Sequence, residues 1–544
     1  MRPDENGRKR LNIAVPAYGI LPSRPAGAAE ALQDFGVIGL LGIPGFWKIT
    51  GAPENTDTGA FTGTFTATFT ATFENSDSLE NSGTFADIYL TEGLFMKLFK
   101  LITAGLIASV LSAFSAGCGT VTVDSGIYRA TADEMAEAAL KTPYNEPVRG
   151  IWVTPRMSAS ARQDDYNEAY KQVKEAGINM VFTFDETSSK SKMEKLLEAC
   201  KVNEIKAIIS LPRISNSSQI KNQLKLVNEY DSHPAVLGYN LYDEPGRSVF
   251  EVLGEEYNEI RKICSPDKII MINFFPNYVS PEAIDFKDEG ARSWYQNYLY
   301  TYYDMAASDV VSFDNYPYRA DPAGDEAAVA GTVSNLCDIA MLGRDKNLPC
   351  WGFVQCGEWG GTRTPDYGEL RYLAHLHLLF GLKGYSYFLY VTPVDGSTEE
   401  GVFKGMVTFQ GEKTKTYENV QKLNKELDGM KGVYLDYGFK GVIERNLPDV
   451  IKNSISATYA VESFGGVSKI ATDGRVIIGC FEKSDGHKAL YLLNNDPYND
   501  TEVTVTLSEL SEFKLWSGKG IEDMGADREI LIRLGYGEGK FLEF

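Results

Sequence analysis

The chain has 544 residues, of which 43% are hydrophobic, and its formal net charge is −21. This length exceeds that of one ordinary domain and suits a barrel of about 250–350 residues with a smaller domain beside it. The acidic balance argues against a nucleic-acid-binding or anionic-membrane-binding surface, because both require basic patches. Seven cysteines without a motif spacing and four dispersed histidines indicate neither a disulfide framework nor a metal site, and we expect no cofactor.

The first 95 residues lack the pattern of a folded domain. Residues 61–73 form a simple repeat of phenylalanine and threonine with alanine or glycine between them. Such a segment can pair as a strand, but nothing around it supplies a core. We therefore expect residues 1–95 to be a disordered or non-native extension, and Met96 to be the true start of the protein.

A secretory signal is predicted over residues 96–117. A basic start precedes an apolar run at 101–114, and a small-residue segment leads from Ser115 to Cys118. The ending resembles a bacterial lipobox, which implies lipidation of Cys118 and a cell-surface or outer-membrane lipoprotein. Ser115 departs from the leucine usual at its position, and without the lipid the exported protein would be secreted or periplasmic. The alternative is a buried helix over 98–113.

A regular alternation of apolar strands and amphipathic helices begins near residue 150. Buried strands that alternate with helices predict a parallel sheet, and eight of them predict a closed (β/α)8 TIM barrel rather than an open sheet. The fifth unit is the least regular, since its strand is followed by an irregular aromatic connection at 281–288 and 294–303. The strands are expected at 151–154, 180–184, 205–211, 236–242, 269–275, 310–316, 350–355 and 385–391. Helices are expected at 166–176, 193–202, 220–230, 249–264, 370–382 and 417–427.

Short strands separated by turns follow residue 432. Residues 503–507 alternate between apolar side chains and threonine, as a half-buried antiparallel strand does. The pattern predicts a small all-β sandwich, and no motif within it suggests chemistry. The other strands of this region are expected at 476–481, 489–493, 513–516 and 530–534. The expected parts of the chain are an extension (1–95), a signal peptide (96–117), a linker and lead-in (118–144), the barrel (145–432) and the sandwich (433–544).

The fourth barrel strand ends in two carboxylates. Residues 238–246 read Gly-Tyr-Asn-Leu-Tyr-Asp-Glu-Pro-Gly, and Pro245 has no amide hydrogen with which to continue a sheet ladder. Counting back by two from Glu244 places Tyr242 on the same face. We therefore expect Glu244 to point into the barrel mouth, where a TIM barrel carries its chemistry. The alternative is a strand-end glutamate in a loop salt bridge.

A second motif follows the seventh strand and makes a resemblance visible. Asp-Glu-Pro at 243–245 resembles the Asn-Glu-Pro at the acid/base of glycoside hydrolase clan A, which includes families five and forty-two. Gly-Glu-Trp-Gly-Gly at 357–361 resembles the nucleophile motif Gly-Glu-Phe-Gly of family five. The resemblance covers about residues 145–430. It implies a glycosidase in which Glu244 is the acid/base and Glu358 the nucleophile, about 5 Å apart as in retaining enzymes; the signal segment predicts that this enzyme is exported.

Two features depart from the clan pattern. Asp243 replaces the asparagine that holds the sugar 2-hydroxyl, and no tryptophan follows strand eight, where Tyr387 is the nearest aromatic candidate. Glu358 also shares a strand face with Val354 and Cys356 unless a bulge at the intervening glycine reverses it. The predicted substrate-binding residues are Asp243, Tyr242, Asn273, Tyr316, Trp359, Asp185 and Tyr387.

Two alternatives remain beside the retaining hydrolase. One is a non-catalytic surface lipoprotein that captures carbohydrate on a barrel that has lost its activity. The other is an inverting enzyme in which Asp314 or Asp185 activates water and Glu358 is structural. In each case the expected partner is an oligo- or polysaccharide, nucleic acid is not expected, and contact with a membrane is expected only through the lipid anchor. The sequence indicates neither the sugar and its linkage nor the oligomeric state.

Overall fold

The computed structural model describes residues 11–12, 68–69, 146–286, 293–393 and 403–544. The predicted signal segment and Cys118 lie outside these residues. In the first part of the chain the described residues are two short strands, β1 (Leu11–Asn12) and β2 (Thr68–Phe69), which pair antiparallel. No helix among the described residues combines the length and the apolar character needed to span a membrane.

A closed barrel of eight parallel strands follows, in the order β10-β3-β4-β5-β6-β7-β8-β9. The predicted fold class is therefore confirmed. The predicted seventh strand agrees with the structure at both ends, whereas the first was predicted three residues too late. The strands are β3 (Val148–Ile151), β4 (Met180–Phe182), β5 (Lys206–Ser210), β6 (Val236–Asp243), β7 (Ile269–Phe274), β8 (Val311–Asp314), β9 (Cys350–Gln355) and β10 (Gly384–Phe388).

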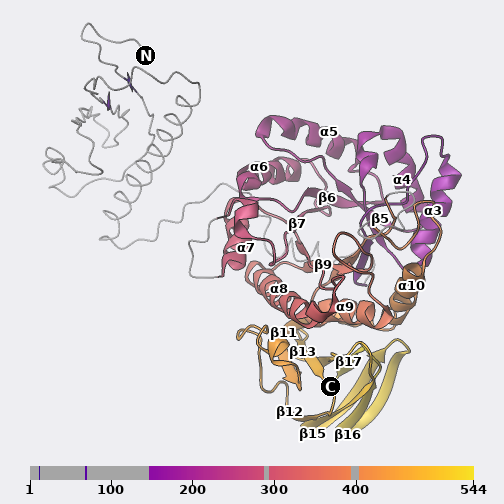
Figure 1. Ribbon diagram of the computed structural model, residues 1–544, viewed down its shortest axis with the longest axis vertical. Coiled ribbons are helices and arrows are strands. Elements are labelled where there is room, and N and C mark those ends of the chain that lie inside the picture. Colours follow the sequence, from indigo (N-terminus) through magenta and orange to yellow (C-terminus); the bar gives the residue numbers. More distant parts are fainter. Residues whose placement is uncertain (1–10, 13–67, 70–145, 287–292, 394–402) are drawn as a thin grey trace, which may run out of the picture. The chain divides into compact units, whose positions relative to one another are not determined.

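Eight helices surround the strands (Figure 1). They are α3 (Gln163–Glu175), α4 (Lys190–Val202), α5 (Ile220–Tyr230), α6 (Phe250–Arg261), α7 (Trp294–Met305), α8 (Asp325–Lys346), α9 (Tyr367–Leu379) and α10 (Lys415–Leu427). Short helices within or after the barrel are η1 (Asp185–Ser188), η2 (Ser217–Gln219), η3 (Arg247–Val249), η4 (Pro281–Ile284), η5 (Pro322–Gly324) and η6 (Tyr434–Asp436).

The prediction of an irregular connection at 294–303 was wrong, because this segment is helix α7. Tyr298 and Tyr302 pack edge-on against Phe274 of β7, with ring centroids 5.7 and 5.1 Å apart. Six of the twelve residues of α7 are aromatic, and five of these are buried. Aromatic side chains spread around the helix blur the apolar stripe by which an amphipathic helix is recognised in a sequence.

Two apolar layers hold the barrel together. One fills its interior, where side chains from the strands pack among themselves, as Met180, Ile208 and Phe353 do. The other lies between the strands and the helices and continues onto one face of the C-terminal sheet through Phe481 and Phe541. Burial of apolar surface contributes about 25 cal/mol per Å². The shared layer therefore joins the barrel and the sheet into one packed unit.

The C-terminal region is an antiparallel sheet that curls on itself. Residues 503–507 and 513–516, predicted as two strands, belong to the single strand β15. Both halves of the sheet face a second apolar core that includes Val476, Leu490 and Ile532, which confirms the sandwich. The strand order is β11-β13-β14-β17-β15-β12, with β16 beside β15. The elements are β11 (Gly438–Arg445), α11 (Asp449–Lys452), β12 (Val467–Ala471), β13 (Val476–Glu482), β14 (Lys488–Asn494), β15 (Thr501–Ser517), β16 (Gly520–Leu534) and β17 (Gly539–Glu543).

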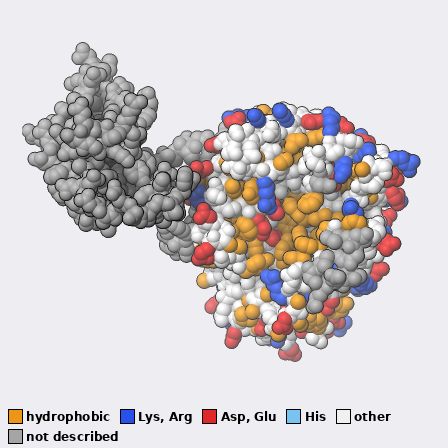
Figure 2. Space-filling view, turned by 45° about the horizontal axis from the view of Figure 1, so that its top comes forward, with side chains coloured by type: hydrophobic (Ala, Val, Ile, Leu, Met, Phe, Trp, Pro, Cys, Tyr) orange, Lys and Arg blue, Asp and Glu red, His pale blue; other side chains and the backbone are white. Residues whose placement is uncertain are grey.

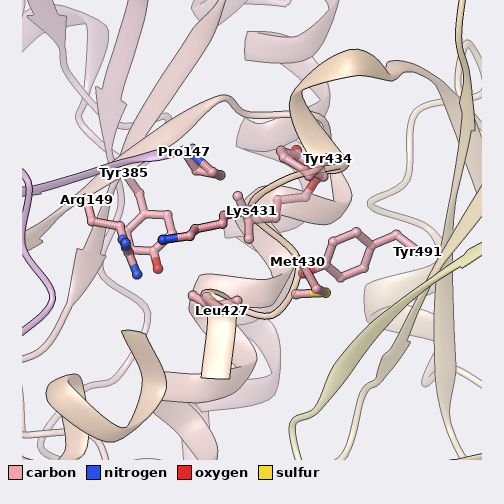
Figure 3. A pocket seen from close by; sticks show the side chains of 9 residues that line it. Pro147, Arg149, Tyr385, Leu427, Met430, Lys431, Tyr434 and Tyr491 are labelled. Atoms are coloured by element: carbon pink, nitrogen blue, oxygen red, sulfur yellow. The ribbon is translucent and has the colours of Figure 1, made fainter. Parts of the chain in front are cut away.

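The junction between barrel and sheet is closely packed. Figure 3 shows a small cavity there, where Tyr385 of β10, Leu427 of α10, Tyr434 and Tyr491 of β14 converge from different elements. Its volume of ≈ 10 Å³ is room for a single water at most. The cavity is therefore a packing defect of the junction and too small for an organic ligand.

Candidate active site at the carboxyl end of the barrel

The end of β6 contains a bulge that changes which way its side chains point. Asn240 pairs with Met271 and Tyr242 with Ile272, so Leu241 is an extra residue in the ladder. The strict alternation expected from the sequence is therefore wrong here. Tyr242 packs against the outer apolar layer beneath the Arg213 guanidinium, 5.0 Å from the ring centroid. This placement does not support the predicted contact of Tyr242 with substrate.

Asn273 of β7 brings two carboxyl groups together inside the barrel. Its Nδ2 donates to Asp314 Oδ1 (3.1 Å) and to Asp243 Oδ1 (3.4 Å), and its Oδ1 accepts from Ser312 Oγ (2.9 Å). The amide is thus fully used by protein partners. Asn273 positions the two acids, and it has no amide hydrogen left for a sugar in this arrangement.

Glu244 follows directly after β6 in an unusual backbone conformation. Its φ is 57°, in the left-handed region, and its N–H donates to Asn273 O (2.8 Å). A non-glycine residue in this region costs about 1–2 kcal/mol, and such strain is often found at functional sites. The turn places the Glu244 carboxyl beside Asp314.

The three carboxyl groups repel one another in a partly buried environment. Burial raises the pKa of Glu244 to about 7; the Asp243 charge adds to this, while Arg213 and a hydrogen bond with Asp314 oppose it. Burial likewise raises the pKa of Asp314 well above its usual value, with further contributions from Glu244 and Asp243. Because charged carboxylates so close together disfavour ionisation, the cluster retains a proton near neutral pH.

Three residues around this cluster were not predicted from the sequence as site residues. Arg213 donates to the Asp243 carbonyl (2.9 Å) and lies near its carboxylate (3.5 Å). Tyr278 has a pKa raised by burial and by the charge of Asp314, and the Arg319 guanidinium lies 5.0 Å from its ring centroid. All three lie on loops after different strands, with no motif around them. Only the closure of the barrel brings them to Glu244.

Glu358 lies on the rim after β9, where a bulge does occur. The amides of Cys356 and Gly357 both donate to Phe388 O, at 3.0 and 3.2 Å. A Cβ on Gly357 would lie 2.2 Å from Lys404 O, so this close approach requires glycine. Val354 and Cys356 belong to the outer apolar layer. The bulge explains how the Glu358 side chain can point away from the outer face of the strand, on which Val354 and Cys356 lie.

The Glu358 carboxylate is held by two donors. Oε1 lies 2.5 Å from Lys404 Nζ, and Oε2 accepts from Thr364 Oγ1 (3.1 Å). Burial alone would raise the pKa of Glu358, but the hydrogen bonds from Lys404 and Thr364 and the Lys404 charge outweigh it and lower the pKa. Glu358 is therefore ionised under conditions in which Glu244 retains its proton.

Tyr316 and Trp359 connect the two halves of the rim. Their rings pack edge-on, with centroids 4.8 Å apart, and Phe388 packs against both. Burial raises the pKa of the Tyr316 hydroxyl, and the charges of Asp314, Asp243 and Glu244 raise it further. Tyr316 thus reaches the carboxyl cluster at one end and contacts the residue after Glu358 with its ring. Both belong to the apolar cluster of the barrel interior.

The remaining predicted residues lie elsewhere. Tyr387 is fully buried between β10 and α10, where its hydroxyl donates to Asn424 Oδ1 (2.7 Å), so it is inaccessible to a sugar. Asp185 begins η1, and its side chain is outside what the structure describes. Its neighbour Glu186 accepts from Thr154 Oγ1 (2.5 Å) and from the Phe184 amide (2.8 Å).

The surface of the folded part carries both apolar and charged side chains. Apolar side chains gather across the middle of the face in Figure 2, with acidic and basic side chains around them. Among the described residues, no group of three or more histidine, cysteine, aspartate or glutamate side chains is arranged to hold a metal ion.

Comparison with known proteins gives structural matches without sequence matches. No protein-family model and no curated protein sequence matches the chain. A family 39 glycoside hydrolase from Bacteroides cellulosilyticus WH2 aligns over 73% of this chain and 81% of its own, at 14% identity and a TM-score of 0.42. A β-galactosidase from Bacillus circulans sp. alkalophilus aligns over 74% of this chain and 100% of its own, at 10% identity and a TM-score of 0.49.

A third match covers less of the known protein. A β-galactosidase from the psychrophilic Marinomonas ef1 aligns over 54% of this chain and 63% of its own, at 12% identity and a TM-score of 0.41. The alignment thus spans less than two thirds of that enzyme. All three TM-scores lie below 0.5.

Proposed function

We propose that the protein is a glycoside hydrolase that uses Glu244 as acid/base and Glu358 as nucleophile on the carboxyl-end rim of its barrel. The observation that carries this proposal is the contrast between the two carboxyl environments: Glu244 lies beside two further carboxyl groups, whereas Glu358 is paired with Lys404, and their pKa values shift in opposite directions. Cleavage of a glycosidic bond with retention needs one protonated and one ionised carboxyl group. Environments that push two carboxyl pKa values apart assign these roles.

The two glutamates would act in two steps. Glu358 attacks the anomeric carbon while Glu244 gives its proton to the leaving oxygen, so the glycosidic bond breaks and a covalent glycosyl-enzyme forms. Glu244 then takes a proton from water, the water oxygen attacks the same carbon, and the bond to Glu358 breaks. Burial and the Asp243 charge would keep Glu244 protonated at the start, and Trp359 and Tyr316 offer apolar ring surface near the two glutamates.

The pH dependence of turnover follows from these assignments. Glu244 must be protonated in the first step, so kcat/KM is expected to fall as pH rises through about 7. Glu358 must be ionised, so activity is expected to fall at acidic pH only below the ordinary range of a glutamate. A profile with no loss of activity between pH 6 and 9 would contradict the role of Glu244.

Substitution of the two glutamates tests the mechanism. Glu358→Ala should abolish turnover of an aryl glycoside, and azide should partly restore it with an inverted glycosyl azide as product. Glu244→Ala should reduce kcat by about 10²–10⁴-fold on substrates with poor leaving groups. It should do so much less on activated aryl glycosides, because these need no proton. Equal losses on both substrate types would contradict the assignment.

One observation favours a second candidate, a carbohydrate-binding protein without catalysis. The 2.5 Å ion pair with Lys404 occupies the carboxylate that would have to attack. Lys404→Ala distinguishes the two functions. In an enzyme, loss of the ion pair should change turnover and its acidic pH limb, whereas a capture protein should bind oligosaccharide and release it intact before and after the substitution.

The contact between Glu244 and Asp314 bears on the inverting alternative. An inverting pair stands about 6.5–9.5 Å apart to leave room for water, whereas these two carboxyl groups are hydrogen-bonded to each other. In the retaining scheme, Asp314→Asn should therefore leave the anomeric configuration of the product retained. Product of inverted configuration from the parent, observed by NMR, would support the inverting scheme instead.

Export and lipidation at Cys118 belong to the same proposal. If Met96 is the true start, mass spectrometry of native material should find no peptide from residues 1–95. Cys118→Ala should move the protein from the membrane fraction to the soluble fraction. A variant that stays on the membrane would show that another tether holds it.

A further inference from the structure

An open groove lies between the barrel and the C-terminal sheet, away from the carboxyl-end glutamates. Its volume is ≈ 300 Å³, which is the lower end of the range for small-ligand sites. Helices α9 and α10 form one wall, and the β15–β16 turn with β17 forms the other. The lining residues are Tyr367, Arg371, Lys422, Lys425, Glu426, Ser517, Gly518, Lys519, Glu538 and Lys540.

The two acidic residues of the groove are already neutralised. Arg371 Nη2 lies 2.9 Å from Glu426 Oε1 and 3.0 Å from Glu538 Oε1, and its side chain is 10% exposed. His375 Nε2 also contacts Glu426 Oε1 (3.1 Å), and Lys540 Nζ lies 3.8 Å from Glu538 Oε2. Both carboxylates of the groove are therefore paired with cationic side chains of the protein itself.

Three exposed lysines of the groove have no such partner. Within the described part of the chain, Lys422, Lys425 and Lys519 form no ion pair, and Lys422 Nζ lies 3.5 Å from the centroid of the Tyr367 ring. The five cationic and two anionic side chains leave an excess of three positive charges, on a chain whose net charge is −21. A concave site of one sign concentrates ligands of the opposite sign.

The walls of the groove are fixed by close backbone packing. A Cβ on Gly518 would lie 2.6 Å from Glu426 Cγ, and one on Gly429 would lie 1.9 Å from Ser517 O. The β15–β16 turn is therefore seated against the end of α10 at a distance that only glycine allows. A site whose walls are already in place loses little conformational entropy when a ligand binds.

We infer that this groove binds the sulfate or carboxylate groups of an acidic saccharide chain, as an accessory site on the protein. The anion chemistry follows from the three unpaired lysines, and the choice of a saccharide rests on the proposed function. Lys422 and Lys425, three residues apart on α10, lie on one wall, and Lys519 lies on the other. Acidic groups along one chain can thus contact both walls.

Binding of matched neutral and charged probes tests the inference. We expect dextran sulfate oligosaccharide to bind the full chain at low salt, and uncharged dextran of the same length not to bind. The combined variant Lys422→Ala/Lys425→Ala/Lys519→Ala should weaken dextran sulfate binding at least tenfold and reduce its salt dependence. The control Lys221→Ala/Lys225→Ala/Lys469→Ala removes three exposed lysines outside the groove and should stay within about twofold of the parent.

Three other outcomes of the binding experiment would contradict the inference. Unchanged binding in the groove variant would place the site elsewhere. Displacement by low millimolar inorganic phosphate would make it a phosphate site, and equally tight binding of duplex DNA would make it a general polyanion surface. The groove variant should still cleave a small aryl glycoside at the parental rate. Loss of groove binding with activity intact thus separates this inference from the proposed function.

Discussion

Two glutamates, Glu244 on the barrel rim and Glu426 at the junction with the C-terminal sheet, are both largely removed from solvent and differ in their partners. Burial alone would raise the pKa of Glu426, but His375 and Arg371 outweigh it and lower the pKa to about 2. Burial raises the pKa of Glu244 to about 7, and the charge of its neighbour Asp243 adds to the rise. Matched charge makes Glu426 structural, whereas unmatched charge leaves Glu244 with a proton to donate.

The two sites therefore contribute to stability in opposite ways. The pKa of Glu426 is lower in the folded state, so its contribution is full above the unfolded value near 4.5 and is lost as pH falls toward 2. The pKa of Glu244 is higher in the folded state, so the folded protein holds its proton more tightly. Its contribution is present below about pH 4.5 and is lost as pH rises to about 7.

Removal of the cation at the junction should give the largest effect. Arg371→Leu leaves Glu426 and Glu538 without their shared partner, and breaking a buried pair costs about 3–5 kcal/mol. Denaturant unfolding at pH 7 would measure the loss. A change below about 1 kcal/mol would show that the junction does not depend on charge matching.

A third glutamate, Glu256, is buried without any charged or hydrogen-bonding partner among the described residues. Glu256 of α6 is fully buried, neither carboxyl oxygen has a hydrogen-bond partner, and burial raises its pKa to about 8. As pH rises from 4.5 to 8 the folded protein should lose up to about 1.4 kcal/mol per unit from this group. Glu256→Met should remove that dependence and stabilise the protein relative to the parent at pH 9. If the free energy of unfolding changed with pH equally in variant and parent across this range, the role assigned to Glu256 would be contradicted.

Neutralising the catalytic candidate should stabilise the fold by a smaller amount. Glu244→Gln removes the unmatched charge beside Asp243 and Asp314, and we expect a gain of about 2 kcal/mol at pH 8 and almost none at pH 5. Thermal unfolding at the two pH values measures this difference. Destabilisation at both values would mean that Glu244 is held by attractive contacts, as Glu426 is.

The smallest effect is expected at an exposed ion pair. Arg213→Leu removes the contact with Asp243, but the Arg213 side chain is 60% exposed, and such pairs contribute about 0–1 kcal/mol. The substitution should change the pH profile of activity more than the stability. The Arg213 charge opposes the rise of the Glu244 pKa, so its removal should move the alkaline limb of activity to higher pH. Equal pH profiles for variant and parent would exclude Arg213 from the site.

Local rules predicted where the two candidate glutamates lie in the fold. Pro245 ends β6 and places Glu244 directly after it, and the glycine-rich segment around Glu358 follows β9 in the same way. The barrel itself follows from eight alternations of strand and helix. These inferences succeeded because they depend on backbone hydrogen bonding and burial within short segments.

The partners of these residues could not be predicted in the same way. Counting by two failed at Tyr242, because a bulge at Leu241 shifts the register against β7. Tyr387 lies in the outer layer, where its hydroxyl bonds Asn424 of a helix 37 residues away. Such contacts depend on strand register and on which helix covers which strand, and neither is encoded in one segment.

The amino-acid sequence by itself determined the order of the elements, the closed barrel, the sandwich and the position of Glu244 and Glu358 at strand ends, because periodicity and chain breakers act locally. Only the tertiary structure decided that Asn273 and Asp314 meet Glu244, that Lys404 holds Glu358, and that Arg371 neutralises Glu426. A carboxyl pKa depends on charges within a few ångströms, and in this protein those charges come from strands, helices and loops far apart along the chain.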